Sequence, residues 1–406
     1  MSEKTMKNIP KLRFSEFMNS GEWQEKKLGD LGDLVASGDL NSELFSEIQT
    51  NQHIYPVYSN SISNNGLYGY YLSPKYPKNS VTITARGNLG IAFNRESEFV
   101  GIGRLLILSN LKSHISNFIK ELWNHSALIP LENGGIPQLT AIKAKQTILL
   151  IPEQKEQQKI SDCLNSIDTL IFVQNQKIKL LEKHKKGLLQ NFFPKDGEDI
   201  PKIRFPEFLN DEKWEKTTIG KIGSFYYGKS APKWSLEEDA LTPCVRYGEL
   251  YTKFGTVITE TYSRTNIDPK NLKFSRGGEI LIPRVGEKPE DFGKCCCYLP
   301  LGNIAIGEMI SVFETSQNPL FYTYYFRNLY KNFANVVEGQ NVKNLYYVEL
   351  EPLEIYRPSL EEQQKIADCL TSIDEQINLQ IQKVESLKEH KKALLQQLFP
   401  SNEVNE

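Results

Sequence analysis

The chain has 406 residues, with 48 lysines and arginines against 50 acidic residues, so its formal net charge is −2. The length predicts two or three domains. The balanced charge excludes a uniformly basic nucleic-acid binder, so any such contact would come from local patches. The first residues lack a signal-peptide core, and no apolar run could span a membrane. The six cysteines have neither disulfide nor metal spacing, and we expect a reduced, cytoplasmic protein without a metal site or a membrane partner.

The chain begins with a leader segment that runs Ile-Pro-Lys-Leu-Arg-Phe-Ser-Glu-Phe from Ile9 and continues to Trp23. A variable segment follows, in which short strand patterns alternate with glycines and tyrosines. Within it, Val81-Thr-Ile-Thr-Ala-Arg86-Gly87 is typical of a strand that ends in an arginine and a glycine turn. A helix is expected near residues 116–124.

One long helix is predicted between Pro152 and Pro194, two residues at which helices commonly begin and end. Its apolar residues recur at alternating steps of four and three, which is the seam of a coiled coil. A helix of this length spans about 60 Å and needs a partner to cover its apolar face. The predicted pairing positions are Ile160, Leu164, Ile167, Ile171, Gln174, Ile178 and Leu181.

The whole arrangement then repeats. The leader returns from Ile200 to Trp214, and the long helix returns between Pro358 and Pro400. Its predicted pairing positions are Ile366, Leu370, Ile373, Ile377, Gln380, Val384 and Leu387. The second variable segment contains Ile280-Leu-Ile-Pro-Arg284-Val-Gly286, which we align with the Arg86 strand and turn. A helical stretch is expected near residues 319–333.

The repeats predict an α/β (α+β) protein with two similar mixed domains, two long helices in an antiparallel coiled coil, and a circular, pseudo-two-fold repeat. The predicted segments are a first domain with its leader at 1–146, a helix at 147–194, a second domain with its leader at 195–352, a helix at 353–400 and a tail at 401–406.

Charge favours the antiparallel order. The net charge is −2 over residues 152–169 and +4 over 170–194, then −4 over 358–375 and +2 over 376–400. Antiparallel helices place each acidic half beside a basic half, with Gln174 and Gln380 near the middle, where polar residues can fix the register. The helix macrodipole also favours acidic residues near the start of a helix and basic residues near its end. Antiparallel pairing and the macrodipole can therefore both explain the charge gradient.

These features resemble the specificity subunit of a type I restriction–modification enzyme. The resemblance covers the whole chain and rests on the Arg-Phe-x-Glu-Phe…Trp leaders, the Glu-Gln-Gln-Lys-Ile helix starts at Glu156 and Glu362, and the doubled His-Lys-Lys triplets at His184 and His390. It implies a non-catalytic subunit with two target recognition domains, each of which reads half of a bipartite site in double-stranded DNA. The helices are then expected to set the spacer between the half-sites.

The same resemblance implies two modification (methyltransferase) subunits as partners, docked on the helices, and restriction subunits that translocate and cleave DNA. It implies no cofactor on this chain; S-adenosylmethionine, ATP and Mg²⁺ are expected on the partner subunits, which methylate adenine or restrict the DNA. Two fragments tempt a catalytic interpretation, Phe99-Val-Gly-Ile-Gly103 and Asn318-Pro-Leu-Phe321. A turn glycine and a helix start explain them better, so we predict no catalytic residue.

Arginine suits bidentate contact with guanine, and asparagine or glutamine suits adenine. On this basis the candidate DNA-binding residues are Asn60, Asn64, Tyr68, Arg86 and Asn88 in the first domain, and Arg246, Tyr247, Tyr251, Lys253, Arg284, Lys288, Asn341 and Lys343 in the second. The alternative for each is an ordinary solvated turn or a core tyrosine. The alternative for the whole chain is a coiled-coil protein-interaction scaffold that reads no DNA sequence.

Overall fold

The computed structural model describes residues 8–126, 137–195 and 197–400. The chain divides into two compact units, one of residues 1–175 with 382–406 and one of residues 176–381. Each unit therefore contains the first part of one long helix and the last part of the other. No helix within the described ranges is long and apolar enough to cross a membrane.

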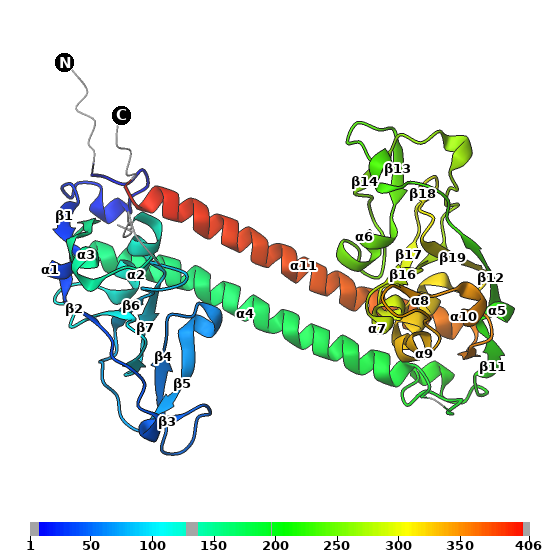
Figure 1. Ribbon diagram of the computed structural model, residues 1–406, viewed down its shortest axis with the longest axis horizontal. Helices are drawn as coiled ribbons and strands as arrows, with labels where there is room; N and C mark the ends of the chain where they lie inside the picture. The colour runs from blue at the N-terminus through cyan, green and yellow to red at the C-terminus, as the bar shows by residue number, and fades with distance from the viewer. Residues whose placement is uncertain (1–7, 127–136, 196, 401–406) are drawn as a thin grey trace. The chain divides into compact units, whose positions relative to one another are not determined.

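The first unit is built on a four-stranded antiparallel sheet in the order β2-β9-β6-β7 (Figure 1). A second sheet, β3-β5-β4-β8, contains the parallel pair β4–β8. The strands are β1 Gln24–Lys27, β2 Asp33–Ala36, β3 Phe45–Ser46, β4 Tyr55–Tyr58, β5 Leu67–Tyr71, β6 Ser80–Ile83, β7 Ala92–Arg95, β8 Val100–Gly101, β9 Leu106–Ser109 and β10 Ile148–Ile151. The helices are α1 Leu28–Leu31, α2 Ser116–Ser126, α3 Ala141–Gln146 and α4 Gln154–Phe192.

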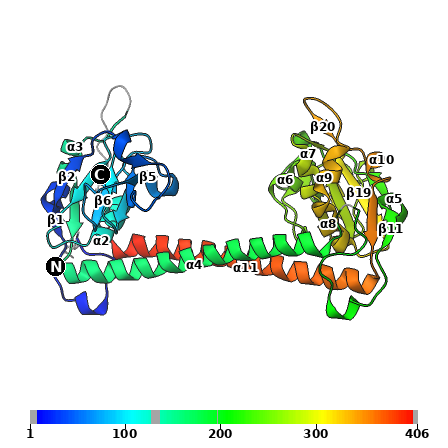
Figure 2. The ribbon, with the colours of Figure 1, turned by 90° about the horizontal axis from the view of Figure 1, so that it is seen from below.

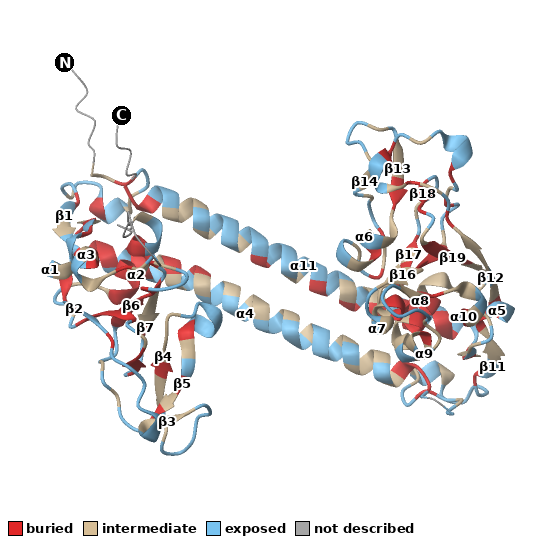
Figure 3. Ribbon diagram, in the orientation of Figure 1, coloured by how far each residue is buried: buried red, intermediate tan, exposed pale blue. Residues whose placement is uncertain are grey.

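The core of this unit joins the sheet to the helices. All four residues of β6 are buried because α2 covers one face of the strand, and α2 in turn lies against the start of α4 (Figure 2). Trp23, Phe118 and Phe399 pack edge to face around this junction, with ring centroids 5.7 to 6.1 Å apart. Figure 3 shows the buried residues concentrated here, whereas much of the helix surface is exposed.

The second unit repeats the plan with sheets β12-β19-β15-β17 and β14-β13-β18. The predicted helix near residues 319–333 is broken into two, α8 and α9. The strands are β11 Glu215–Thr218, β12 Gly223–Tyr227, β13 Thr242–Val245, β14 Ser263–Thr265, β15 Glu279–Pro283, β16 Val285–Gly286, β17 Cys297–Leu299, β18 Ala305–Ile306, β19 Ile310–Thr315, β20 Lys343–Asn344 and β21 Glu354–Arg357. The helices are α5 Ile219–Ile222, α6 Tyr247–Thr252, α7 Pro289–Lys294, α8 Pro319–Asn328, α9 Tyr330–Asn335, α10 Tyr347–Leu350 and α11 Leu360–Leu398.

The repeated leader and helix-start motifs are explained by one buried ion pair in each unit. Arg13 donates two hydrogen bonds to Glu156, at 2.8 and 2.7 Å, and the Trp23 indole N–H lies 3.4 Å from the same carboxylate. Arg204, Glu362 and Trp214 form the same group at 2.9, 2.7 and 3.0 Å. Both glutamates are only 1% exposed, so the carboxylates need these partners. The leader is thereby tied to the first turn of the long helix.

The next residue of each helix start, Gln157 or Gln363, ties the helix to its domain. Its side-chain amide donates to the carbonyl of the preceding proline, Pro152 or Pro358, at 3.0 and 2.9 Å. Its side-chain oxygen accepts from the backbone just before the domain helix, at Ile115 in one unit and Asn318 in the other. The Glu-Gln dipeptide therefore anchors both the leader and the domain.

Within each unit, the two long helices run antiparallel. In the first unit, Ile160 and Leu164 of α4 share a core cluster with Leu398 and Phe399 at the end of α11. In the second, Ile366 and Leu370 of α11 share one with Phe192 and Phe193 at the end of α4. The antiparallel fold prediction is confirmed by this arrangement.

The pairing positions differ in burial along the seam. Ile160, Leu164, Ile167, Ile366, Leu370, Ile373, Ile377 and Val384 are buried, while Ile171, Gln174, Ile178, Leu181, Gln380 and Leu387 are half-buried. The side-chain oxygens of Gln174 and Gln380 are buried and have no hydrogen-bond partner among the described residues. A polar group in this state destabilises the seam, which is the cost expected of a polar register position.

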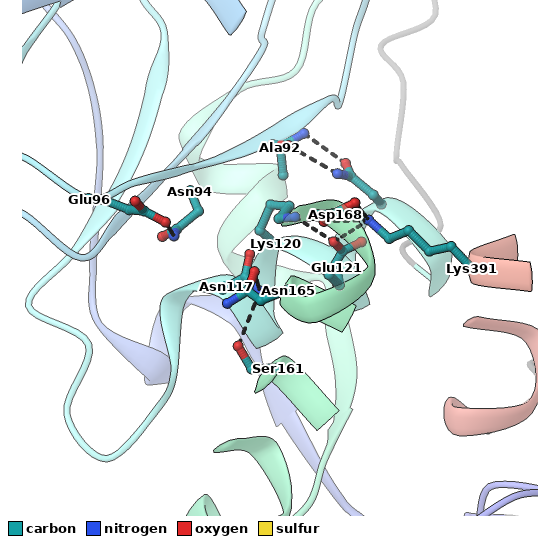
Figure 4. Close-up of polar contacts among 11 residues, drawn as sticks. Ala92, Asn94, Glu96, Asn117, Lys120, Glu121, Ser161, Asn165, Asp168 and Lys391 are labelled. Atoms are coloured by element: carbon teal, nitrogen blue, oxygen red, sulfur yellow. Dashed lines mark hydrogen bonds and ion pairs between the residues drawn. The ribbon is translucent and has the colours of Figure 1, made fainter. Parts of the chain in front are cut away.

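The middle lysine of each His-Lys-Lys triplet makes a cross-helix ion pair. Lys391 of α11 contacts Asp168 of α4 and Glu121 of α2, each at 2.8 Å (Figure 4). Burial alone would lower the pKa of Lys391, but hydrogen bonds and attraction from the two carboxylates outweigh it, and the pKa is raised. Three segments far apart in the sequence thus meet at one ammonium group.

In the second unit the corresponding lysine, Lys185, contacts Asp374 at 2.5 Å. The hydroxyl of Tyr324, on α8, donates to the same carboxylate at 2.8 Å, so the network again includes the domain helix. Here a single carboxylate does not outweigh burial, and the pKa of Lys185 is lowered. The two units therefore place a lysine at the same position of the long helix, with two carboxylate partners in the first unit and one in the second.

We predict that Lys391→Met lowers the free energy of unfolding of the first unit by about 1–3 kcal/mol, because it leaves the buried Glu121 with one cation fewer. The matched control is Lys388→Met, which removes an exposed lysine paired with Glu385 on the same helix. The control is expected to cost less than about 1 kcal/mol. Chemical denaturation of both variants measures the difference, and equal effects would contradict the role given to Lys391.

Candidate nucleic-acid interface

The predicted correspondence between Arg86 and Arg284 is wrong by one residue. The Leu139 N–H donates to the Ala85 carbonyl at 3.1 Å, and the Leu345 N–H donates to the Arg284 carbonyl at 2.9 Å. Since the matching leucines bind Ala85 and Arg284, these two residues are equivalent. The sequence alignment placed a gap where the two strands have none.

Asn60 has a structural role in the first domain, and its contact with DNA stays a prediction. Its side-chain oxygen accepts from the Ala85 N–H and its amide donates to the Gly103 carbonyl, both at 2.7 Å. A carboxamide has two N–H donors and an oxygen with two lone pairs, so these two bonds use half of its hydrogen-bonding capacity. The side chain joins three separate segments of the first domain.

Two of the remaining first-domain candidates lie on or beside one exposed loop. Asn64 and Asn65 have φ values of 48° and 52°, and Gly66 follows with φ 82°, so three consecutive residues are left-handed. The loop is closed by the Ser59 N–H, which donates to the Gly66 carbonyl at 2.9 Å. Tyr68, 54% exposed, stacks on Phe45 with 5.4 Å between centroids. Asn64 and Tyr68 are therefore presented to solvent.

Arg86 and Asn88 lie in the turn between β6 and β7, and both side chains are exposed. The backbone of this turn is held by Thr84, whose hydroxyl donates to the Asn88 carbonyl and accepts from the Ile91 N–H. Thr84 therefore fixes the backbone of the turn, while the side chains of Arg86 and Asn88 are exposed to solvent. This is the arrangement that base or phosphate contacts require.

In the second domain, Arg246 and Tyr247 begin α6. The Arg246 N–H donates to the Glu249 side chain at 2.8 Å, which caps the helix. Both residues line a hollow of about 260 Å³ together with Ser230 and Met309. The register of the parallel pairs β4–β8 and β13–β18 makes Tyr58 the equivalent of Val245. Beyond these strands the first domain continues into the loop of residues 59–66 and the second into α6, so the two domains differ there.

Tyr251 has a structural role in the second domain, and its contact with DNA stays a prediction. Its hydroxyl donates to the Val285 carbonyl at 3.1 Å, and its ring packs edge-on against Phe292. Burial raises its pKa strongly. The nearby Lys253 is exposed, with its ammonium 5.7 Å from the centre of the Tyr262 ring, and stays available.

Arg284 is held between two tyrosines. Its guanidinium lies 4.6 Å from the Tyr227 ring centroid and 5.5 Å from that of Tyr346, and its Nε is buried without a hydrogen-bond partner among the described residues. Stacking on aromatic faces pre-orders an arginine for bidentate contact. The two tyrosines were not predicted from the sequence, because residues 227 and 346 meet only through the fold.

Three other basic or polar candidates lie around the hairpin that follows Arg284. Strand β16 pairs with β20, which places Lys343 opposite Gly286, two residues from Arg284. Lys343 donates to the Gly339 carbonyl at 2.6 Å, while Lys288 and Asn341 are exposed. The structure thus gathers Arg284, Lys288 and Lys343 from two distant segments.

Sequence reasoning missed Arg95 and Arg104 of the first domain. Arg95 is 4% exposed, with its guanidinium 3.5 Å from the Tyr58 ring centroid, and burial lowers its pKa to about 10. Arg104 is exposed, with φ 64°. Neither property has a local sequence signal. Among the described residues, no group of three or more His, Cys, Asp or Glu side chains could hold a metal ion.

The two domains thus share one fold but carry different side chains at corresponding exposed positions, each on a pair of long helices. Residues 20–183 and 211–389 match the family model described as the type I restriction modification DNA specificity domain. The two matches cover most of the chain. The chain belongs to this family, and the specificity subunits of the family are non-catalytic.

Two curated relatives come from Methanocaldococcus jannaschii. The chain is 27% identical over 289 residues to the putative type I restriction enzyme MjaX specificity subunit, covering 69% of this chain and 64% of that protein. It is 23% identical over 339 residues to the MjaIX specificity subunit, covering 80% and 77%. The first alignment thus spans slightly less than two thirds of that relative.

Two solved structures share the fold. One is the crystal structure of a type I restriction–modification S subunit from M. genitalium, with a TM-score of 0.63 and 16% identity over 97% of this chain and 99% of that one. The other comes from a study of complex assembly in the type I system, with a TM-score of 0.54 and 18% identity over 94% and 98%. At these identities the likeness concerns the fold.

We predict that Arg284→Ala weakens binding in the second half of a DNA target by about 1–3 kcal/mol at one base position and relaxes specificity there. Arg284→Lys is not expected to restore it, because lysine cannot stack or bind bidentately. The control is Arg276→Ala, an exposed arginine of the same domain beside Glu314. Titration of duplexes altered in one half at a time measures the effect. Unchanged DNA affinity would make Arg284 a structural residue.

Proposed function

We propose that this chain is the DNA sequence-specificity subunit of a type I restriction–modification complex. Each recognition domain reads one half of a bipartite target in double-stranded DNA. The observation that carries the proposal is the pair of matched domains whose scaffold contacts are repeated and whose exposed residues are not. One example is the place held by Ala85 and Arg284, where the same backbone contact, from Leu139 or Leu345, leaves a methyl group in one domain and a guanidinium in the other.

The same proposal gives the long helices two roles. They set the spacer between the half-sites, and they dock two modification subunits, to which restriction subunits add cleavage. Exposed apolar side chains on α4 support the docking role, since Phe172 is 62% exposed and Val173 51% exposed. Isolated helices seldom leave such residues in water without a partner. S-adenosylmethionine, ATP and Mg²⁺ belong to the partner subunits in this proposal.

A protein-interaction scaffold without DNA reading is the competing function. It would explain the exposed apolar residues of the helices equally well. It would not explain why Arg284 is stacked between two tyrosines with its backbone fixed, since a scaffold needs no pre-ordered arginine on its domains. The two functions therefore differ in what the domains do.

We predict that the chain, assembled with its modification subunits, selects a split motif from a pool of random duplexes. The two halves of the motif are expected to be separated by a spacer of fixed length, because the long helices set the spacer in this proposal. Methylation mapping in cells that express the same complex should recover the same motif at adenines. No enrichment at moderate salt would contradict the proposal and favour the scaffold.

A further inference from the structure

Arg104 of the first domain has an unusual backbone for its side chain. Its φ is 64° and that of Gly103 is 70°, so two consecutive residues are left-handed. This conformation is sterically unfavourable for a residue with a Cβ atom, and glycine adopts it without that penalty. The Arg104 side chain is exposed and forms no ion pair within residues 8–126, 137–195 and 197–400. Neither burial of the side chain nor an ion pair therefore explains why residue 104 is an arginine.

Asn60 places Arg104 close to Arg86. One carboxamide binds both the Ala85 N–H and the Gly103 carbonyl, so the two backbone segments that continue into the next residues lie beside the same asparagine. Those residues are Arg86 and Arg104. Asn60 belongs to the exposed loop of residues 59–66, which contains no acidic residue. The backbones of both arginines therefore lie near one loop that carries no negative charge.

A third arginine lies beneath this loop. Arg95 donates its Nε–H to the Thr82 hydroxyl at 2.9 Å, while its Nη2 is buried without a partner among the described residues. That Nη2 lies 3.6 Å from where a Cβ on Gly66 would be. Arg95 makes no ion pair with a carboxylate of the described residues, and burial lowers its pKa. The loop therefore lies above an uncompensated positive charge, which favours an anion at its surface.

We propose that Arg104 and Arg86 contact backbone phosphates of double-stranded DNA on the two sides of loop 59–66, so that Asn64 faces the bases. Buried Arg95 is a positioning residue that supports the loop and adds to the positive potential. Phosphate contacts of this kind fix the protein on the duplex and carry no sequence information. The inference rests on the proposed function and adds the place where the first domain holds the backbone.

The second domain lacks the Arg104 contact. The Arg284 N–H donates directly to the Met309 carbonyl at 3.0 Å, without an asparagine between the segments. The residue equivalent to Arg104 is Met309, since Leu105 and Ile310 hold the same place against Ser37 and Gly228. The proposed pair of phosphate contacts by Arg104 and Arg86 therefore belongs to the first domain and has no counterpart in the second.

The test uses Arg104→Gly in the chain assembled with its modification subunits. Glycine removes the side chain and relieves the left-handed backbone, so thermal stability is expected to stay equal or rise. Affinity is expected to fall roughly threefold to tenfold for both the selected target and a random duplex. The slope of log affinity against log salt should become smaller by about 1.

Asn303→Gly is the matched control, because Asn303 is exposed and left-handed, with φ 61°, but carries no charge. It should leave DNA affinity and salt slope unchanged. Wild-type affinity and slope in Arg104→Gly would overturn the inference, and so would a loss confined to one base pair. The random duplex reports a phosphate contact by itself. A wild-type chain that selects no split motif would therefore overturn the proposed function alone and leave the result for Arg104 valid.

Discussion

The structure depends on a buried arginine–glutamate pair that occurs once in each unit. Arg13 binds Glu156 across 143 residues, and Arg204 binds Glu362 across 158. A buried carboxylate without such partners would be strongly destabilising, and each pair is bidentate and completed by a tryptophan N–H. In the sequence, the leader precedes a variable domain and the helix start follows it. The ion pair therefore holds the two ends of the domain together.

Because the contacts between its two ends hold each domain together, the sequence of the rest of the domain can vary. The short antiparallel pairs β1–β10 and β11–β21 join the two ends of each domain beside the ion pair. The exposed loops connect strands whose registers are fixed by the central sheets. Substitutions in those loops alter the surface without disturbing the anchor, which is the physical basis for two unlike recognition surfaces on one scaffold.

The repeated architecture could be predicted from the sequence because it depends on local patterns. The heptad seam, the Glu-Gln-Gln helix starts and the charge gradient each specify the helices and their antiparallel order without knowledge of the domains. The cross-helix pair of Lys391 and Asp168 follows from the same gradient. Glu121 could not be added to it from sequence, since it comes from a domain helix placed only by the fold.

The candidate interface was less predictable because exposure and pairing are tertiary properties. An asparagine in a polar loop indicates a free amide, yet the Asn60 side chain makes hydrogen bonds to two backbone groups. A tyrosine beside a lysine indicates a surface contact, yet the Tyr251 hydroxyl is bound to Val285. The alignment of Arg86 with Arg284 was wrong because it matched an arginine and a glycine in each sequence and ignored the strand register. The backbone hydrogen bonds make Ala85 the equivalent of Arg284.

The central claim is that each domain reads DNA as a separate unit on a common base. Replacing residues 34–141 with the recognition domain of another specificity subunit, while Arg13, Trp23 and Glu156 are kept, tests it most directly. Methylation mapping in cells is expected to show a new first half-site, with the second half-site and the spacer unchanged. A simultaneous change of both half-sites would contradict the account.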